Sequence, residues 1–211
     1  MDDLLFDPTL TSSSSDPAPE PAPEPAAEPI AVADELEDQD LAAELVGPVD
    51  GSTPTLSLEE RLNTALALVW AELASRASEQ SFLDLLAEVF GASPEAAADL
   101  ATRLAAGDTL GLRYEIETGA EMEGAAGAYA VVGDNGVATI YISGEWLANA
   151  SDDQIRMVLL EEIGHSFDTE LNGGVDTAGD EGELFANLFS GVELSEEQRS
   201  AILAENDSTT L

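Results

Sequence analysis

One short stretch of this chain carries the side chains best suited to chemistry. It reads Leu159-Leu-Glu-Glu-Ile-Gly-His165 and contains the only histidine of the 211 residues. On a helix, Glu161 and His165 are i and i+4 and project from the same face, and Glu162 lies beside them. Carboxylates in an otherwise apolar helix are costly to bury without a partner. A metal ion, a network of arginine or water, or an exposed face must therefore receive them.

The spacing resembles the H-E-x-x-H motif of zincin metallopeptidases, with glutamate in place of the first histidine. In that family, positions one and five hold the metal and position two activates water. The resemblance therefore implies that Glu161 and His165 are metal ligands and that Glu162 is the general base. Zincins also have an edge strand that borders the substrate cleft just before this helix. By the same resemblance, the strand predicted at residues 139–143 would align the substrate.

A downstream segment, Gly179-Asp-Glu-Gly-Glu-Leu-Phe-Ala-Asn187, resembles the second helix of gluzincins. In that helix, a glutamate followed by a small residue and a Phe-Ala pair supplies the third metal ligand. The match implies Glu181 as the third ligand, with Glu183 and Asp180 as alternatives. Carboxylates bind zinc at about 2.0–2.2 Å, so glutamate ligands alter such a site without abolishing it.

The charge of this ligand set bears on activity. Two carboxylates and one imidazole neutralise a divalent ion more fully than two imidazoles and one carboxylate. The ion then polarises its water less, so we expect weak hydrolysis. Zn is the expected metal, with Mn or Fe as alternatives, because oxygen-rich ligand sets tolerate Mn²⁺ and Fe²⁺ better. These considerations predict a weak or degenerate metallopeptidase that acts on a peptide or protein substrate.

A second resemblance covers Val158–Asp168, the following Asn-Gly loop and the sequence Gly-Asp-Glu-Gly182. These residues resemble a module of very large secreted cyanobacterial proteins that carry haemolysin-type calcium-binding repeats. The resemblance implies a bacterial protein that is secreted or on the cell surface by a type I-like route, with the bacterial cytoplasm as the alternative. The start of the chain, Met1–Leu5, is acidic where a Sec signal would be basic. The nonapeptide repeats themselves are missing.

Two non-enzymatic functions stay open beside the peptidase. The first is a secreted surface or adhesion-associated module that keeps the zincin scaffold without catalysis. The second is an acidic decoy or inhibitor in which the N-terminal segment acts. An oxygen-rich loop at Asn172–Asp180 could also hold Ca²⁺, but its spacing does not match an EF-hand, and a solvated loop is the favoured interpretation.

The composition restricts the partners. The chain has 44 acidic residues, 6 arginines and no lysine, which gives a formal charge of −38. Such a charge repels phosphate backbones and anionic lipids, so we expect no nucleic-acid partner, whereas divalent cations are favoured. The absence of cysteine excludes disulfides and thiolate metal ligands. No apolar run approaches the roughly 18 residues of a membrane span.

The segments that must position the site differ in composition. Residues 1–55 contain nine of the ten prolines, and 14 acidic residues fall within the first 50, which predicts a disordered acidic tail. Residues 56–108 predict a helical subdomain, and residues 109–205 predict the zincin-like α+β domain. Residues 206–211 are expected to be a flexible C-terminus.

Local signals predict the individual elements. A capping box at Ser57-Leu-Glu-Glu60 begins a first helix, Gly91 ends a second, and Ser93-Pro94 begins a third that runs to Gly107. Strands are predicted at 112–118, 128–132 and 137–143, and the last two are joined by a hairpin turn. Further helices are predicted from the capping box at 151–154 to about His165, at 180–191 and at 195–203. We therefore predict an α+β fold with a small antiparallel sheet between helices.

Overall fold

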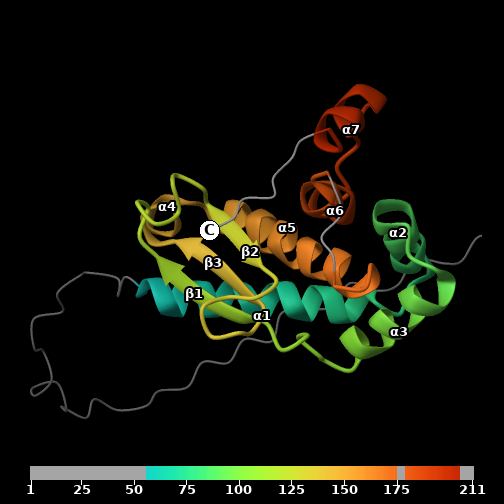
Figure 1. The fold of residues 1–211 in the computed structure, drawn as a ribbon, viewed down its shortest axis with the longest axis horizontal. Helices are drawn as coiled ribbons and strands as arrows, with labels where there is room; N and C mark the ends of the chain where they lie inside the picture. The colour runs from blue at the N-terminus through green and yellow to red at the C-terminus, as the bar shows by residue number, and fades with distance from the viewer. Residues whose placement is uncertain (1–55, 175–178, 205–211) are drawn as a thin grey trace, which may run out of the picture. The chain divides into compact units, whose positions relative to one another are not determined.

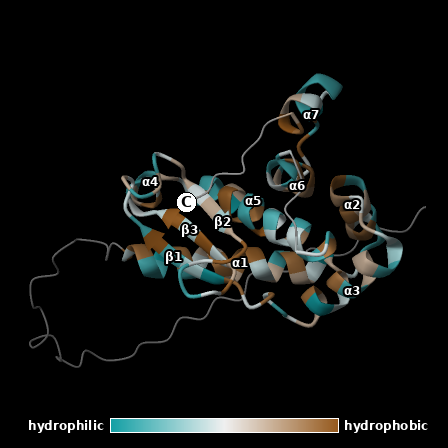
Figure 2. Cartoon of the chain, viewed as in Figure 1, coloured by the Kyte–Doolittle hydropathy of each residue, from teal (hydrophilic) through white to brown (hydrophobic). Residues whose placement is uncertain are grey.

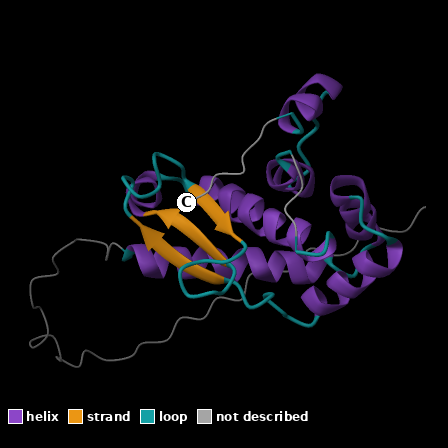
Figure 3. Ribbon diagram, in the orientation of Figure 1, coloured by secondary structure: helices purple, strands orange, loops and turns teal. Residues whose placement is uncertain are grey.

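The computed structural model describes residues 56–174 and 179–204. The predicted tail at 1–55, part of the oxygen-rich loop and the predicted C-terminus at 206–211 lie outside the described residues. The described residues belong to one compact unit, Gly51–Leu211. Within them the fold is α+β, as predicted (Figures 1 and 3). In chain order the elements are α1 (Leu58–Arg76), α2 (Gln80–Phe90), α3 (Pro94–Ala105), β1 (Arg113–Glu117), β2 (Gly127–Ala130), β3 (Thr139–Ser143), α4 (Gly144–Asn149), α5 (Asp152–Leu171), α6 (Glu181–Phe189) and α7 (Glu196–Ile202).

The starts of α1 and α3 and the end of α2 lie at their predicted signals, whereas α3 ends at Ala105, two residues before the predicted Gly107. At the start of α1, the Ser57 side chain accepts from the Glu60 N–H, and the Glu60 side chain accepts from the Ser57 N–H. Helix α2 ends at Gly91, whose φ of 63° is left-handed. Helix α3 has Ser93 as its N-cap and proline in its first turn. These local hydrogen bonds and backbone preferences determine the helix ends without help from distant residues.

The sheet is mixed, which corrects the prediction of an antiparallel sheet. Its order is β1-β3-β2, with β2 antiparallel to β3 and β1 parallel to β3. The predicted hairpin between β2 and β3 is confirmed. The interpretation of residues 139–143 as an edge strand is wrong, because β3 is the central strand and all five of its residues are buried. A strand that is apolar and buried on both faces takes the middle of a sheet, so the edge strand of the hairpin is β2.

Two helices around the candidate site differ from their predictions. The short helix α4 was not predicted; the Ser143 side chain caps it by accepting from the Trp146 N–H. Helix α5 begins at the predicted capping box but continues six residues past His165. At its C-terminal end the Asn172 side chain donates to the Asp168 carboxylate at 2.6 Å. This local bond supports the additional turns.

One hydrophobic core joins the helices to the sheet. It includes residues from α1, α2, α3, β3, α5 and α6, so the segments at 56–108 and 109–205 share it. At the end of the core away from the sheet, phenylalanine rings from α2, α5 and α6 pack with centroids 5.4–6.5 Å apart. Figure 2 shows apolar residues along the helices that carry these rings. None of the helices described here is both long and apolar enough to cross a membrane.

Candidate functional site

The helix that carries the motif is buried almost all round. Between residues 159 and 169, every residue except Glu161 is buried, and Glu161 is half-buried. Helix α5 achieves this because α1, α2, α6 and β2 all pack against it. Glu162, His165 and Asp168 are therefore enclosed, with 5%, 7% and 0% of their surface exposed. Burial of this degree requires hydrogen bonds or compensating charge for each group.

His165 lies beside the N-terminal turn of α6, at a place where Gly164 of α5 and Gly182 of α6 are in close contact. A methyl group on Gly182 would lie 2.5 Å from Nε2 of His165 and 2.6 Å from the carbonyl oxygen of Glu161. A methyl group on Gly164 would lie 2.9 Å from the Gly182 Cα. Only glycine lets α6 approach α5 this closely, so Gly164 and Gly182 place the start of α6 beside the imidazole.

Asp180 is the carboxylate that this approach brings to His165. Its Oδ1 lies 3.7 Å from Nε2 of His165, and both side chains are less than a tenth exposed. The same Oδ1 accepts a hydrogen bond of 2.6 Å from the Glu183 N–H, which makes Asp180 the N-cap of α6. Asp180 therefore orients the first turn of α6 and lies next to the imidazole.

The other predicted third ligands lie around Asp180. Glu181 is 7% exposed, and its carboxylate folds back toward Gly179, where an added methyl group would lie 2.8 Å from Oε1. Glu183 is half-buried, and the Asn187 side chain donates to its carbonyl oxygen at 3.0 Å. In residues 56–174 and 179–204, no three histidine, aspartate or glutamate side chains are arranged to hold a metal ion. The set of Glu161, His165 and Glu181 stays a prediction.

Glu162 contacts the edge strand β2. A methyl group on Gly127 would lie 2.6 Å from Oε1 of Glu162, so glycine is required where the strand meets the carboxylate. Sequence reasoning did not single out Gly127; the available signal was a glycine at the start of a strand, which is typical of close backbone approach.

The register of the hairpin defines which way the Gly127 backbone points. The Ser143 N–H donates to the Ala126 carbonyl at 3.0 Å, so this pair is hydrogen-bonded across the strands. Hydrogen-bonded and non-hydrogen-bonded pairs alternate along an antiparallel ladder, so the next pair, Gly127 and Ile142, is not hydrogen-bonded. The N–H and C=O of Gly127 therefore point away from β3, toward the outer edge of the sheet and beside the Glu162 carboxylate.

The arginines neutralise carboxylates at other positions. Five of the six form ion pairs in the described part of the chain: Arg61–Asp152, Arg76–Glu72, Arg103–Asp108 and –Glu170, Arg156–Glu72, and Arg199–Glu88. Most of these partners are at least a third exposed. The basic side chains thus lie in surface pairs, whereas the imidazole and carboxylates of α5 and α6 gather in the interior.

Comparison with known proteins gives no relative: no family model, curated protein or solved structure matches the chain.

Proposed function

We propose that residues 109–205 form a zincin-like domain that binds a divalent metal ion and has weak metallopeptidase activity, with Glu162 as the general base. The observation that carries this proposal is the position of Glu162. Its carboxylate lies against the antiparallel edge strand β2, on the helix that also places His165 beside Asp180. A general base must lie within reach of the bond to be hydrolysed, and an edge strand offers backbone groups to an extended peptide.

The residue types around His165 favour a divalent cation, although in the described residues no three of these side chains are already arranged around one point. His165 with Glu161 and either Glu181 or Asp180 would hold the ion, because imidazole and carboxylate oxygen are the ligands that Zn²⁺, Mn²⁺ and Fe²⁺ accept. A divalent ion held there would supply Lewis-acid activation of water. Glu162 would accept a proton from the attacking water molecule and deliver it to the leaving amine. Gly127 orients an extended substrate through its outward-pointing N–H and C=O.

Metal content tests the binding part of the proposal. The full chain, purified without chelator and incubated with Zn²⁺, Mn²⁺ or Fe²⁺, should retain about one equivalent after gel filtration, as measured by plasma mass spectrometry. His165→Ala should lose it. Asp153→Asn is the matched control, because Asp153 is an exposed carboxylate on the same helix. Equal metal content in wild type and His165→Ala would reject the site.

Peptide hydrolysis tests the catalytic part. A library of unstructured peptides should be cleaved slowly by the metal-loaded chain, and Glu162→Gln should abolish cleavage while metal content is retained. Cleavage that persists in Glu162→Gln or in excess chelator would show that another activity is responsible. Glu196→Gln, an exposed substitution on α7, controls for the loss of one negative charge.

A non-catalytic scaffold is the second candidate, and a separate observation favours it. Asp180 already caps α6, and Gly182 already packs on the His165 ring, so both groups contribute to the α5–α6 contact. In this alternative, Glu162→Gln changes only stability, and His165→Ala lowers the melting temperature without any metal being lost. Chelator-sensitive cleavage that Glu162→Gln abolishes would reject this alternative.

A further inference from the structure

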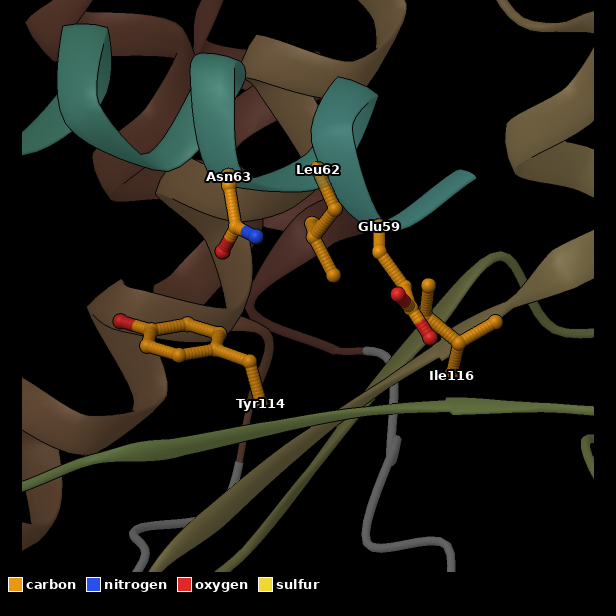
Figure 4. A pocket seen from close by; sticks show the side chains of 5 residues that line it. All are labelled: Glu59, Leu62, Asn63, Tyr114 and Ile116. Carbon is orange, nitrogen blue, oxygen red and sulfur yellow. The ribbon is translucent and has the colours of Figure 1, made fainter. Parts of the chain in front are cut away.

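A second surface feature lies between α1 and β1, on elements that do not carry His165. It is a hollow of about 310 Å³ lined by Glu59, Leu62, Asn63, Tyr114 and Ile116. Figure 4 shows the side chains of Glu59, Leu62 and Asn63 descending from the helix toward those of Tyr114 and Ile116 on the strand. The hollow therefore lies along an edge of the sheet, because β1 is the outer strand opposite to β2.

The register of the parallel pair defines which backbone groups of β1 point outward. The Arg113 N–H donates to the Ala138 carbonyl at 3.0 Å, and Arg113 is aligned with Thr139. In a parallel ladder, alternate residues bond to the neighbouring strand. Since Arg113 bonds to β3, the N–H and C=O groups of Tyr114 and Ile116 point away from it. The two residues whose side chains line the hollow thus also present their backbone groups at the outer edge of the described sheet.

The lining combines an apolar interior with a polar, negatively charged rim. Leu62 is 4% exposed and supplies apolar lining, whereas Glu59 and Asn63 are exposed. The Tyr114 hydroxyl accepts a hydrogen bond of 2.9 Å from Nε1 of Trp70, which holds the ring in place beside the hollow. An aromatic ring, an aliphatic wall, an amide and a carboxylate together suit a side chain with an apolar stem and a cationic head.

We propose that this groove binds an extended peptide segment of a partner protein, which adds to β1 as a fourth strand and inserts a lysine or arginine side chain between Glu59 and Asn63. Charge complementarity identifies the occupant as another molecule. The chain has no lysine, and five of its six arginines are in ion pairs within the described residues. A net charge of −38 also draws a basic segment toward it. Peptide binding at this groove requires neither the proposed metal ion nor catalysis.

Binding of synthetic peptides to the full, ¹⁵N-labelled chain tests the proposal. The probe is a nine-residue peptide of alternating valine and threonine with a central lysine; in the comparison peptides the lysine is replaced by norleucine or glutamate. The lysine peptide should shift the amide signals of Tyr114 and Ile116 and bind more tightly than either comparison peptide. N-methylation of the alternate residues that face β1 should abolish binding, whereas N-methylation of the other set should be tolerated.

A matched pair of variants tests the carboxylate. Glu59 and Glu95 are both exposed glutamates at the second position of a helix, α1 and α3 respectively. Glu59→Gln should weaken binding of the lysine peptide by roughly two- to fivefold, the range of an exposed ion pair, and Glu95→Gln should leave it unchanged. Equal affinity for lysine and norleucine peptides, tolerance of both N-methylated sets, or equal effects of the two variants would overturn the proposal.

Discussion

The two long helices of the domain, α1 and α5, use the same start signal but have opposite surroundings. Helix α1 buries one stripe, Leu62, Leu66, Val69 and Leu73, and leaves residues such as Leu68 67% exposed. Helix α5 is buried on nearly every side between residues 159 and 169, and its buried residues include a glutamate, a histidine and an aspartate. Ionisable groups in such a position are expensive, and they are concentrated where chemistry is performed. This difference makes the polar half of α5, rather than α1, the part of the domain on which the proposed metal chemistry depends.

The largest effect should come from the aromatic packing that holds α6 on α5. Phe185 is fully buried and its ring packs against those of Phe82, Phe90, Phe167 and Phe189. Phe185→Ala should lower the free energy of unfolding by about 3–5 kcal/mol, because it leaves a cavity among these rings. Urea denaturation followed by circular dichroism measures it. Leu68→Ala, on the exposed face of α1, should change the same quantity by less than about 0.5 kcal/mol.

The second largest effect on stability should come from the close contact that Gly182 makes with His165 at the candidate site. Gly182→Ala places a methyl group 2.5 Å from Nε2 of His165 and 2.6 Å from a backbone oxygen that cannot move aside cheaply. We expect a loss of about 1–3 kcal/mol in the free energy of unfolding, accompanied by a shift of the His165 ring signals in NMR spectra. Gly119→Ala is the control, because its nearest neighbour is the flexible end of the Glu145 side chain. An unchanged His165 spectrum in Gly182→Ala would show that α6 does not contact the ring.

These residues also show where sequence reasoning succeeds and where it stops. Helices α1 to α3 and the start of α5 were predicted because capping boxes, Gly91 and Pro94 act within a few residues. The order of the strands was not predicted, because the pairing of β1 with β3 joins segments that are more than 20 residues apart in the sequence. The approach of Asp180 to His165 rests on the contact between Gly164 and Gly182, which no local pattern reveals. The spacing of the motif was enough to predict Glu162 as a site residue. Its contact with Gly127 could be seen only once the position of β2 in the sheet was known.

The hydrogen-bonded pair of Trp70 on α1 and Tyr114 on β1 should make the stability of the domain depend on pH. Burial raises the pKa of Tyr114 above its ordinary value of 10.0, and the hydrogen bond from Trp70 opposes this only in part. In the unfolded chain the phenol ionises near pH 10, while the folded chain keeps it protonated. Below about pH 10 the free energy of unfolding is therefore unaffected by this group. Above pH 10 it falls as the pH rises, and the Tyr114 phenol contributes up to about 1.4 kcal/mol per pH unit to that fall.

Urea denaturation between pH 8 and 11 measures this loss cleanly, because the chain has no lysine or cysteine and only three tyrosines. Tyr114→Phe should flatten the decline above pH 10, even though it lowers stability at neutral pH by leaving the Trp70 N–H without its acceptor. A slope that is identical in wild type and Tyr114→Phe would contradict the assignment of the effect to this phenol.

The smallest effects should come from the two capping boxes, which isolate the difference between α1 and α5. Ser57 and Ser151 make the same pair of hydrogen bonds at the start of their helices. The connection from α4 into the first turn of α5 is also held by Arg61, which donates to the carbonyl oxygens of Leu147 and Ala150. Opening that turn requires the surrounding structure to open, so Ser151→Ala should lower the free energy of global unfolding by about 1 kcal/mol.

Both first turns have exposed residues, at positions 56, 57, 59 and 60 in α1 and at 151–154 in α5, but only the start of α5 follows a helix whose end is held by Arg61, so the first turn of α1 can fray on its own. Ser57→Ala should therefore lower global stability by less than Ser151→Ala, and accelerate amide hydrogen exchange only in the first turn of α1. Exchange measured by mass spectrometry together with urea denaturation separates the two cases. Equal losses in the free energy of global unfolding for Ser57→Ala and Ser151→Ala would mean that α1 and α5 open as one unit. The buried polar half of α5 would then be no more tightly coupled to the core than α1 is.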